Sequence, residues 1–393
     1  MKILRITPFL RGAPINPFHG GKSLTSLKIT NALIMDGNEV YILPWSKENI
    51  HQKTRLKVLN GDGYVVVLPT IYFRSPLKII REAIASFFKN GSLKNPKEHI
   101  WKEIRGSIYN KSHFLKKAVD ATQPDFVHAH YTHSDIADHY RSLGFKIPFI
   151  LTHHSRGVSE SIPLYDYVVF LSHFQQREAL QTYPDIKKKS SVIHNCVSND
   201  YLQPVKPAKS SNILFLSNLK KGKGFDILLD AFCRNQILDK YRLSVIGDGE
   251  LLPKFKKVAL KNRASNVHFL GRVSTDENIE QMEKSTLFVV PSRGEGFGTV
   301  YIEALCCGLP IIGFPPIVEE LNDTLGMKVG LPFDANRESS GDLAQLIERA
   351  MNSNLTDLSY RNEFMKRSRS HFSFDTFKKN YLDMYKDLTV RFS

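Results

Sequence analysis

The residues most able to do chemistry lie in a glycine-rich turn between an apolar run and a helical pattern in the second half of the chain. The turn holds three alternating glycines, Gly294, Gly296 and Gly298. Glycines let the backbone approach a ligand closely, and the free amides of a helix starting near Thr299 would bind phosphate. Glu295 lies in the turn and Glu303 about one turn into the helix, so both can point into one cleft. Because a phosphate would repel carboxylates, we expect the two to bind hydroxyl groups, which ribose and sugars supply.

The chain around this turn has the composition of a globular protein. Its 393 residues suffice for two or three domains, and it is 42% hydrophobic and 24% charged. These values exclude a disordered, collagen-like or disulfide-stapled chain. The four cysteines are too few for a disulfide framework, which indicates a reducing compartment. The N-terminus does not resemble a signal peptide and no window reaches eighteen apolar residues, so we expect a cytoplasmic protein.

Short β-branched runs alternate with amphipathic segments, a pattern typical of βα units and parallel sheets. The expected strands are 2–7, 39–44, 63–69, 125–130, 148–153, 166–171, 212–217, 241–246, 266–270, 286–291 and 309–313. The expected helices are 23–36, 224–234, 250–262, 275–284, 299–307, 341–352, 358–371 and 375–390. An apolar-poor stretch with two prolines between the two series predicts a linker. The fold class is therefore α/β, with two tandem doubly wound Rossmann-like domains and ligands at the carboxyl ends of their strands.

Positive charge is concentrated in the first half. Residues 1–200 hold 27 Lys and Arg against 16 Asp and Glu, and residues 74–117 hold eleven against three. Such a patch attracts phosphates or anionic lipid headgroups. Within it, residues 76–89 form an amphipathic pattern that predicts either an interfacial membrane helix or a domain helix with a solvated basic face. No nucleic-acid-binding module surrounds the aromatic residues here, so nucleic acid is not an expected partner.

Motifs along nearly the whole chain resemble those of the retaining family-4 glycosyltransferases, which have the GT-B fold of two Rossmann-like domains facing a central cleft. The strongest is the E-x7-E element of Glu295 and Glu303, within Glu-Gly-Phe-Gly and Glu-Ala-Leu-x-x-Gly-Leu-Pro. The others are Gly20-Gly21-Lys22-Ser23, Pro124–His130, Ile150–His154, Ser217–Asp226, Val245–Gly249 and Asn266–Gly271. The resemblance implies an acceptor-binding domain over 1–200, a linker over 201–211 and a nucleotide-sugar-binding domain over 212–372. Residues 373–393 would form a helix that crosses back to the first domain.

The resemblance also implies a donor site. Glu303 would hydrogen-bond the ribose, Lys223 would neutralise the diphosphate, and Glu295 with the neighbouring amides would hold the sugar. The implied donor-binding residues are Gly20, Gly21, Asn218, Lys223, Val273, Glu295, Gly296, Phe297, Gly298, Thr299 and Glu303. The implied catalytic residues are His130, Glu295 and Lys223. No cofactor and no metal ion are expected, although three histidines within residues 128–133 could also ligate zinc.

One position departs from the family pattern. The family most often has an arginine five residues before the lysine, whereas this chain has Asn218 before Lys223. An amide brings no charge, so residue 218 does not supply the second cation for the diphosphate. Lys220, Lys221 or Lys22 could compensate.

The expected function is retaining transfer of a sugar from a nucleotide-diphosphate donor, UDP rather than GDP, to a hydroxyl of a glycan, glycolipid or small molecule. Polysaccharide biosynthesis is the expected setting. The basic 74–117 stretch would be the contact with an anionic membrane surface. Two alternatives stay open from the sequence: a GT-B-fold nucleotide-sugar 2-epimerase and a non-catalytic nucleotide-sugar-binding protein.

Overall fold

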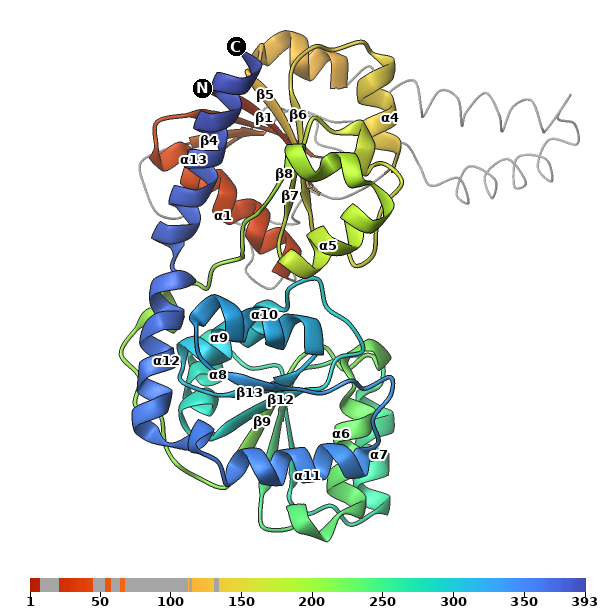
Figure 1. Ribbon diagram of the computed structural model, residues 1–393, viewed down its shortest axis with the longest axis vertical. Coiled ribbons are helices and arrows are strands. Elements are labelled where there is room, and N and C mark those ends of the chain that lie inside the picture. Colours follow the sequence, from red (N-terminus) through yellow and green to blue (C-terminus); the bar gives the residue numbers. More distant parts are fainter. Residues whose placement is uncertain (8–20, 45–53, 58–63, 68–111, 113–114, 131–133) are drawn as a thin grey trace, which may run out of the picture. The chain divides into compact units, whose positions relative to one another are not determined.

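The computed structural model describes residues 1–7, 21–44, 54–57, 64–67, 112, 115–130 and 134–393 (Figure 1). The chain divides into two compact units, each with its own sheet. Unit 1 comprises Met1–Phe170, Glu178–Ser191 and Tyr381–Ser393, and unit 2 comprises Leu171–Arg177 and Val192–Asn380. The sequence alone placed 171–177 and 192–200 with the first domain, whereas these segments belong to unit 2 in the structure. The basic 76–89 segment lies outside the described residues.

Unit 1 is built on a sheet whose strand order, within the described residues, is β3-β4-β2-β1-β5-β6-β7-β8. The strands are β1 (Lys2–Thr7), β2 (Glu39–Pro44), β3 (Thr54–Lys57), β4 (Tyr64–Val67), β5 (Phe126–His130), β6 (Phe149–His153), β7 (Tyr167–Phe170) and β8 (Ser190–Val192). Strands β4, β2, β1, β5, β6 and β7 run parallel, and β3 pairs antiparallel with β4. Strands β5 and β6 are buried along their whole length, which is typical of parallel strands covered on both faces.

The described helices of unit 1 connect successive strands. They include α1 (Gly21–Met35) between β1 and β2, the helical residues 115–122 before β5, α4 (Ser134–Ser142) between β5 and β6, and the end of α5 (His173–Thr182). Gly37, with φ of 77°, follows α1 in the left-handed region and lets the chain turn into β2. The last helix, α13 (Phe374–Phe392), begins in unit 2 and ends in unit 1.

Unit 2 is built on a parallel sheet in the order β11-β10-β9-β12-β13-β14. The strands are β9 (Asn212–Leu216), β10 (Arg242–Ile246), β11 (Val267–Gly271), β12 (Leu287–Val290), β13 (Ile311–Gly313) and β14 (Gly330–Pro332). The chain builds outward from β9 in one direction and outward from β12 in the other. The strand order therefore reverses between β9 and β12, and ligands of open α/β sheets bind at this switch point, beyond the carboxyl ends of the strands.

Helices cover both faces of this sheet (Figure 1). On one face α6 (Phe225–Arg234) packs against α7 (Leu252–Lys261) and α11 (Ser340–Met351). On the other, α12 (Leu358–His371) packs against α9 (Thr299–Cys306) and α10 (Pro315–Leu325). Helix α8 (Thr275–Glu283) begins with a capping box, in which Ser274 and Glu277 each bind the other's backbone amide. This double covering is the doubly wound arrangement expected from the sequence.

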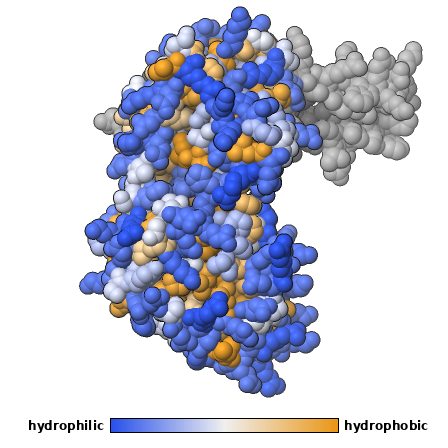
Figure 2. Space-filling view, viewed as in Figure 1, coloured by the Kyte–Doolittle hydropathy of each residue, from blue (hydrophilic) through white to orange (hydrophobic). Residues whose placement is uncertain are grey.

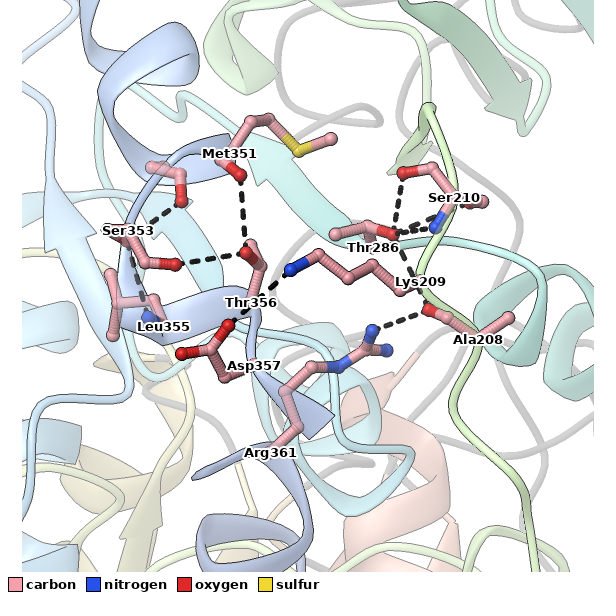
Figure 3. Close-up of polar contacts among 11 residues, drawn as sticks. Ala208, Lys209, Ser210, Thr286, Met351, Ser353, Leu355, Thr356, Asp357 and Arg361 are labelled. Atoms are coloured by element: carbon pink, nitrogen blue, oxygen red, sulfur yellow. Dashed lines mark hydrogen bonds and ion pairs between the residues drawn. The ribbon is translucent and has the colours of Figure 1, made fainter. Parts of the chain in front are cut away.

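The segment 208–210, which leads into β9, is held against the rest of unit 2 by polar contacts (Figure 3). The fully buried Arg361 guanidinium donates to the carbonyl of Ala208 at 2.6 Å and to that of Gly308 at 2.5 Å. The Ser210 amide donates to the Thr286 hydroxyl at 2.7 Å, and that hydroxyl donates to the Ser210 carbonyl at 2.8 Å. Burial lowers the pKa of Arg361 to about 10, so the group stays charged at neutral pH and its carbonyl partners compensate the charge.

The surface visible in Figure 2 is largely hydrophilic, with hydrophobic residues in small separate groups. The core of unit 2 is continuous and brings together side chains from every strand of its sheet and from its covering helices. Among the described residues, no helix combines the length and the apolar character needed to cross a bilayer.

Candidate functional site

The switch point of unit 2 brings together two loops that are about 70 residues apart in sequence. One follows β9 and contains the short 3-10 helix Lys221–Lys223, and the other follows β12 and contains Glu295. Lys223 Nζ donates to Glu295 Oε1 at 2.6 Å. The structure therefore places two of the three predicted catalytic residues in direct contact.

The Lys223–Glu295 ion pair is partly shielded from water. The Glu295 side chain is 9% exposed and that of Lys223 is 30% exposed. Buried Ser292 donates its hydroxyl to the same carboxylate oxygen, Oε1, at 2.7 Å. An ion pair in such an environment is screened less than a surface pair, so both side chains are held in defined positions.

Arg293 joins the same two loops. Its guanidinium donates two parallel hydrogen bonds to Asp226, each at 2.8 Å, and a third to the Lys221 carbonyl at 2.6 Å. The Arg293 amide also donates to the Gly222 carbonyl at 2.9 Å. Sequence reasoning missed this residue, although a charged residue between Ser292 and Gly294 in a glycine turn was a usable signal. Arg293 fixes the β9 loop against the β12 loop, and with it the place of Lys223.

Two glycines allow the close approach of these loops. Gly224, with φ of 70°, precedes α6, and a Cβ there would lie 1.8 Å from the Pro291 carbonyl oxygen. Gly298, with φ of 73°, precedes α9, and a Cβ there would lie 2.8 Å from the Tyr301 ring. Both positions need the left-handed backbone and lack room for a side chain. Any other residue at either position would displace the loop that carries Lys223 or Glu295.

The helix that follows the glycine turn starts at Thr299, as predicted from the sequence. The first amides of a helix have no partner within the helix and carry its positive dipole end, so they suit an anion. Glu303 lies in the second turn of α9 and is half-buried. Burial, and after it the charge of Glu303, raises the pKa of Tyr201.

The remaining predicted donor-binding residues lie in several places. Asn218 is exposed in the loop after β9, and Val273 is half-buried after β11, against the core of unit 2. Gly21 is the first residue of α1 in unit 1, and Gly20 lies outside the described residues. Lys220 and Lys221, named as compensating cations, are exposed beside Asn218 in the same loop.

The third predicted catalytic residue, His130, lies in the interior of unit 1 and is 1% exposed. Its Nε2 contacts the guanidinium of buried Arg5, and its Nδ1 lies 3.0 Å from His154 Nε2. Arg5 also donates to the Ser26 carbonyl at 2.7 Å and to the Thr30 hydroxyl. An arginine can only donate, so His130 accepts at Nε2 and carries its proton at Nδ1.

A second histidine of the same strand takes part in this network. His128 Nδ1 lies 2.6 Å from the Tyr385 hydroxyl and its Nε2 lies 2.8 Å from the Thr152 hydroxyl. Burial, reinforced by the charge of Arg5, holds the pKa values of His128 and His130 well below the ordinary value of 6.5. Both imidazoles are therefore neutral at neutral pH. Contact between His130 and a donor sugar would require its ring to become exposed, and its catalytic role stays a prediction.

Among the described residues, one group could share a metal ion: His173, His194 and Glu320. Both oxygens of Glu320 already accept backbone amides at the start of α5, from His173 at 2.7 Å and from Phe174 at 3.0 Å. The positive end of that helix disfavours a cation. We therefore interpret the group as a carboxylate cap of α5 with a hydrogen-bonded histidine.

Two family models match the chain and together extend from residue 25 to residue 371. The model of Glycosyltransferase Family 4 matches residues 25–201, and that of Glycosyl transferases group 1 matches residues 201–371. An uncharacterized glycosyltransferase of Methanocaldococcus jannaschii is 30% identical over 230 residues, covering 54% of this chain and 62% of that protein. The phosphatidylinositol N-acetylglucosaminyltransferase gpi3 subunit of Schizosaccharomyces pombe is 31% identical over 156 residues, covering 37% of this chain and 33% of that protein. The chain thus spans less than two thirds of the length of either relative.

Two solved structures resemble the whole fold. Sucrose-phosphate synthase from Thermosynechococcus elongatus aligns with a TM-score of 0.72 at 15% identity and covers 100% of both chains. Anabaena HepE in complex with UDP aligns with a TM-score of 0.67 at 17% identity, covering 98% of this chain and 100% of that one. The protein has the GT-B fold and belongs to the glycosyltransferases of the group 1 and family 4 type.

Proposed function

We propose that the protein transfers a sugar, with retention of anomeric configuration, from a nucleotide-diphosphate donor to an acceptor hydroxyl. The observation that carries this proposal is the Lys223–Glu295 pair at the switch point of unit 2, 2.6 Å apart and next to the start of α9. A cation, a carboxylate and a helix N-terminus suit a diphosphate and a sugar hydroxyl in one place. Glu303, one turn further along α9, would bind the ribose.

The proposed reaction needs no protein nucleophile. The bond between the anomeric carbon and the departing phosphate oxygen breaks, and a bond from the acceptor oxygen forms on the same face. The acceptor proton passes to the departing phosphate. Lys223 and the first amides of α9 stabilise the negative charge that develops on that phosphate, which is catalysis by prearranged electrostatics. Glu295 and the amides of Gly296, Phe297 and Gly298 orient the sugar.

We infer UDP rather than GDP as the nucleotide, and a glycan, glycolipid or small molecule as the acceptor. Anabaena HepE, which shares the fold, was solved in complex with UDP, and the Schizosaccharomyces pombe relative is named an N-acetylglucosaminyltransferase subunit. The UDP complex supports UDP as the nucleotide, and the name of the Schizosaccharomyces pombe relative supports a sugar as the transferred group. We further propose that transfer needs no metal ion, because Lys223 and α9 supply the positive charge. The four free cysteines support a cytoplasmic location. Polysaccharide synthesis at an anionic membrane, contacted through residues 74–117, is the proposed setting.

Calorimetric titration with UDP and with GDP, in EDTA, tests the donor site. We expect UDP to bind, with an affinity about tenfold lower in Glu303→Ala, which loses the charge-assisted bond to ribose. Lys261→Met, a change of an exposed lysine at the last residue of α7, serves as the control and should bind UDP like the wild type.

Turnover of the nucleotide sugar, measured with and without an acceptor, separates the alternatives. Release of UDP only when an acceptor is supplied supports the transferase. Conversion of the donor sugar without an acceptor would instead indicate a 2-epimerase. Binding of a nucleotide sugar without turnover by any acceptor would favour the non-catalytic binding protein. If neither UDP nor GDP binds at millimolar concentration, the proposed function is wrong.

A further inference from the structure

The donor loop, comprising Glu295–Gly298, is anchored on its buried side by residues that lie far away in sequence. Buried Ser172 donates its hydroxyl to the Gly296 carbonyl at 2.7 Å. The same hydroxyl accepts the amide of Gln175 at 3.1 Å, in the first turn of α5. Ser172 therefore fixes one peptide of the donor loop to the start of a helix.

The side chain of Phe297 anchors the next residue of the loop. It is 2% exposed, so it points into unit 2 and away from solvent. Its ring stacks on that of His194, with centroids 5.0 Å apart and planes inclined by 15°. The ring of Phe372 completes the contact, 6.2 Å from Phe297 and 6.1 Å from His194. Such an offset stack holds both the position and the tilt of the Phe297 ring.

His194 is itself fixed at both ring nitrogens. Nε2 lies 2.9 Å from Glu320 Oε1, and Nδ1 lies 3.2 Å from His371 Nε2. Its side chain is 12% exposed and that of Glu320 is 4% exposed. With both nitrogens engaged, the imidazole cannot rotate about its long axis without breaking a hydrogen bond. The plane on which Phe297 rests is therefore set by Glu320 and His371.

The groups around this imidazole keep defined charges at neutral pH. Burial alone would raise the pKa of Glu320, but hydrogen bonds from His194 and from the His173 and Phe174 amides outweigh burial, and the pKa lies below 4.5. Burial, with the charge of His194, lowers the pKa of His371 to about 4. Glu320 is thus a carboxylate and His371 is neutral. These two partners of His194 therefore keep the same charge between pH 5 and 8.

We infer that His194 is a positioning residue for the donor sugar, acting through Phe297. Its fixed ring sets the tilt of Phe297, and this sets where the amides of Gly296, Phe297 and Gly298 point. The inference rests on the proposed function, in which those amides hold the sugar, whereas Lys223 and Glu303 hold the diphosphate and the ribose. Loss of His194 should therefore weaken binding of the sugar part of the donor and leave binding of the nucleotide part nearly unchanged.

The first test compares the affinities for UDP and for UDP-glucose, or for GDP and GDP-mannose if GDP is the nucleotide bound. In His194→Ala we expect the nucleotide sugar to bind about tenfold more weakly, with nucleotide affinity within about twofold of the wild type. His194→Phe should recover part of the loss, because a flat ring remains against Phe297. His268→Ala, which removes a half-buried histidine on β11, is the matched control and should change neither affinity.

The second test does not depend on the donor. Hydrogen exchange of peptides covering 293–300 should be faster in His194→Ala than in the wild type and unchanged in His268→Ala. Faster exchange without any nucleotide binding in the wild type would leave the anchoring intact and refute the proposed function. Unchanged exchange, or equal losses of nucleotide and nucleotide-sugar affinity, would overturn the role of His194.

Discussion

Each unit holds a cluster of charged and titratable side chains, and the two clusters are built in opposite ways. In unit 2, Lys223 and Glu295 lie on loops beyond the strand ends, and Lys223 remains 30% exposed. In unit 1, Arg5 and His130 lie on the strands themselves and are at most 1% exposed. A charged side chain at a strand end can bind a ligand, whereas a charged side chain within a sheet contacts only its protein partners.

A high density of histidines therefore does not by itself mark a reactive site. His128 and His130 are held neutral by burial and by the charge of Arg5, and their nitrogens are used by Thr152, Tyr385, Arg5 and His154. Such a network specifies how the sheet packs against α1 and α13. A loop cluster that serves the reaction and a strand cluster that serves stability should therefore respond differently to mutation.

The largest effect should come from Lys223→Met. We expect kcat/KM to fall about 1000-fold, about 4 kcal/mol, because the charge that stabilises the departing phosphate is lost. The measurement is steady-state transfer from the donor identified by titration. Lys261→Met, at the exposed end of α7, should keep wild-type activity. A Lys223→Met enzyme within tenfold of the wild type would show that this lysine does not stabilise the departing phosphate.

The matching change in unit 1 is Arg5→Ala. It removes a buried guanidinium that donates to Ser26, Thr30 and His130, so we expect a loss of about 3 kcal/mol in the free energy of unfolding. Urea denaturation followed by hydrogen exchange would locate the loss in unit 1 peptides. UDP affinity of the folded protein should stay unchanged. A loss below about 1 kcal/mol, or faster exchange in unit 2 as well, would mean that Arg5 is not a local structural residue.

Acid should destabilise unit 1 before it affects the carboxylates of unit 2. Below about pH 6.5 the unfolded chain binds a proton at His128 and His130, whereas the folded chain does not. The unfolded state then binds more protons, so stability falls by about 1.4 kcal/mol per pH unit for each such histidine. Glu320, with a pKa below 4.5, contributes nothing to this slope above pH 5, whereas His371 of unit 2, with its pKa lowered to about 4, adds to it.

Denaturation between pH 5 and 7 measures this slope. His128→Phe should reduce it, since one of the two imidazoles is gone. An identical slope in the variant and the wild type would assign the acid sensitivity to other groups.

Much of the fold was predictable, because burial leaves a local pattern in the sequence. Strands β1 and β2 occupy the expected residues, and the expected β9–β13 pattern and α9 are present. Helix α10 was not among the helices expected from the sequence. In the structure Pro315 and Pro316 are the first residues of the helix, where a missing amide costs nothing.

The candidate site was also predictable only where its features are local in the sequence. Glycine turns and a helix start are local features, so the sequence could indicate Glu295, Gly298 and Thr299. The partners of a side chain are not local. The contact between Lys223 and Glu295 spans 72 residues and that between His194 and Glu320 spans 126. Hydrophobic periodicity does not encode such long-range contacts. The family resemblance pointed to Lys223, but neither the resemblance nor the sequence pattern pointed to Arg293 or His194.

The smallest effect tests the position where the chain departs from its family. Asn218 is exposed in the loop that carries Lys223, so an arginine there would meet no obstruction from the core. We expect Asn218→Arg to bind UDP about fivefold more tightly, because a guanidinium adds a second, bidentate cation for the diphosphate. The gain should shrink in about 0.5 M salt, since charges on an exposed loop are screened. Calorimetry at two salt concentrations measures both effects, and Asn218→Gln, which adds length without charge, should show neither. If the arginine brings no gain even at low salt, the diphosphate does not lie beside residue 218, and the charge that accompanies Lys223 must come from Lys220, Lys221 or the start of α9.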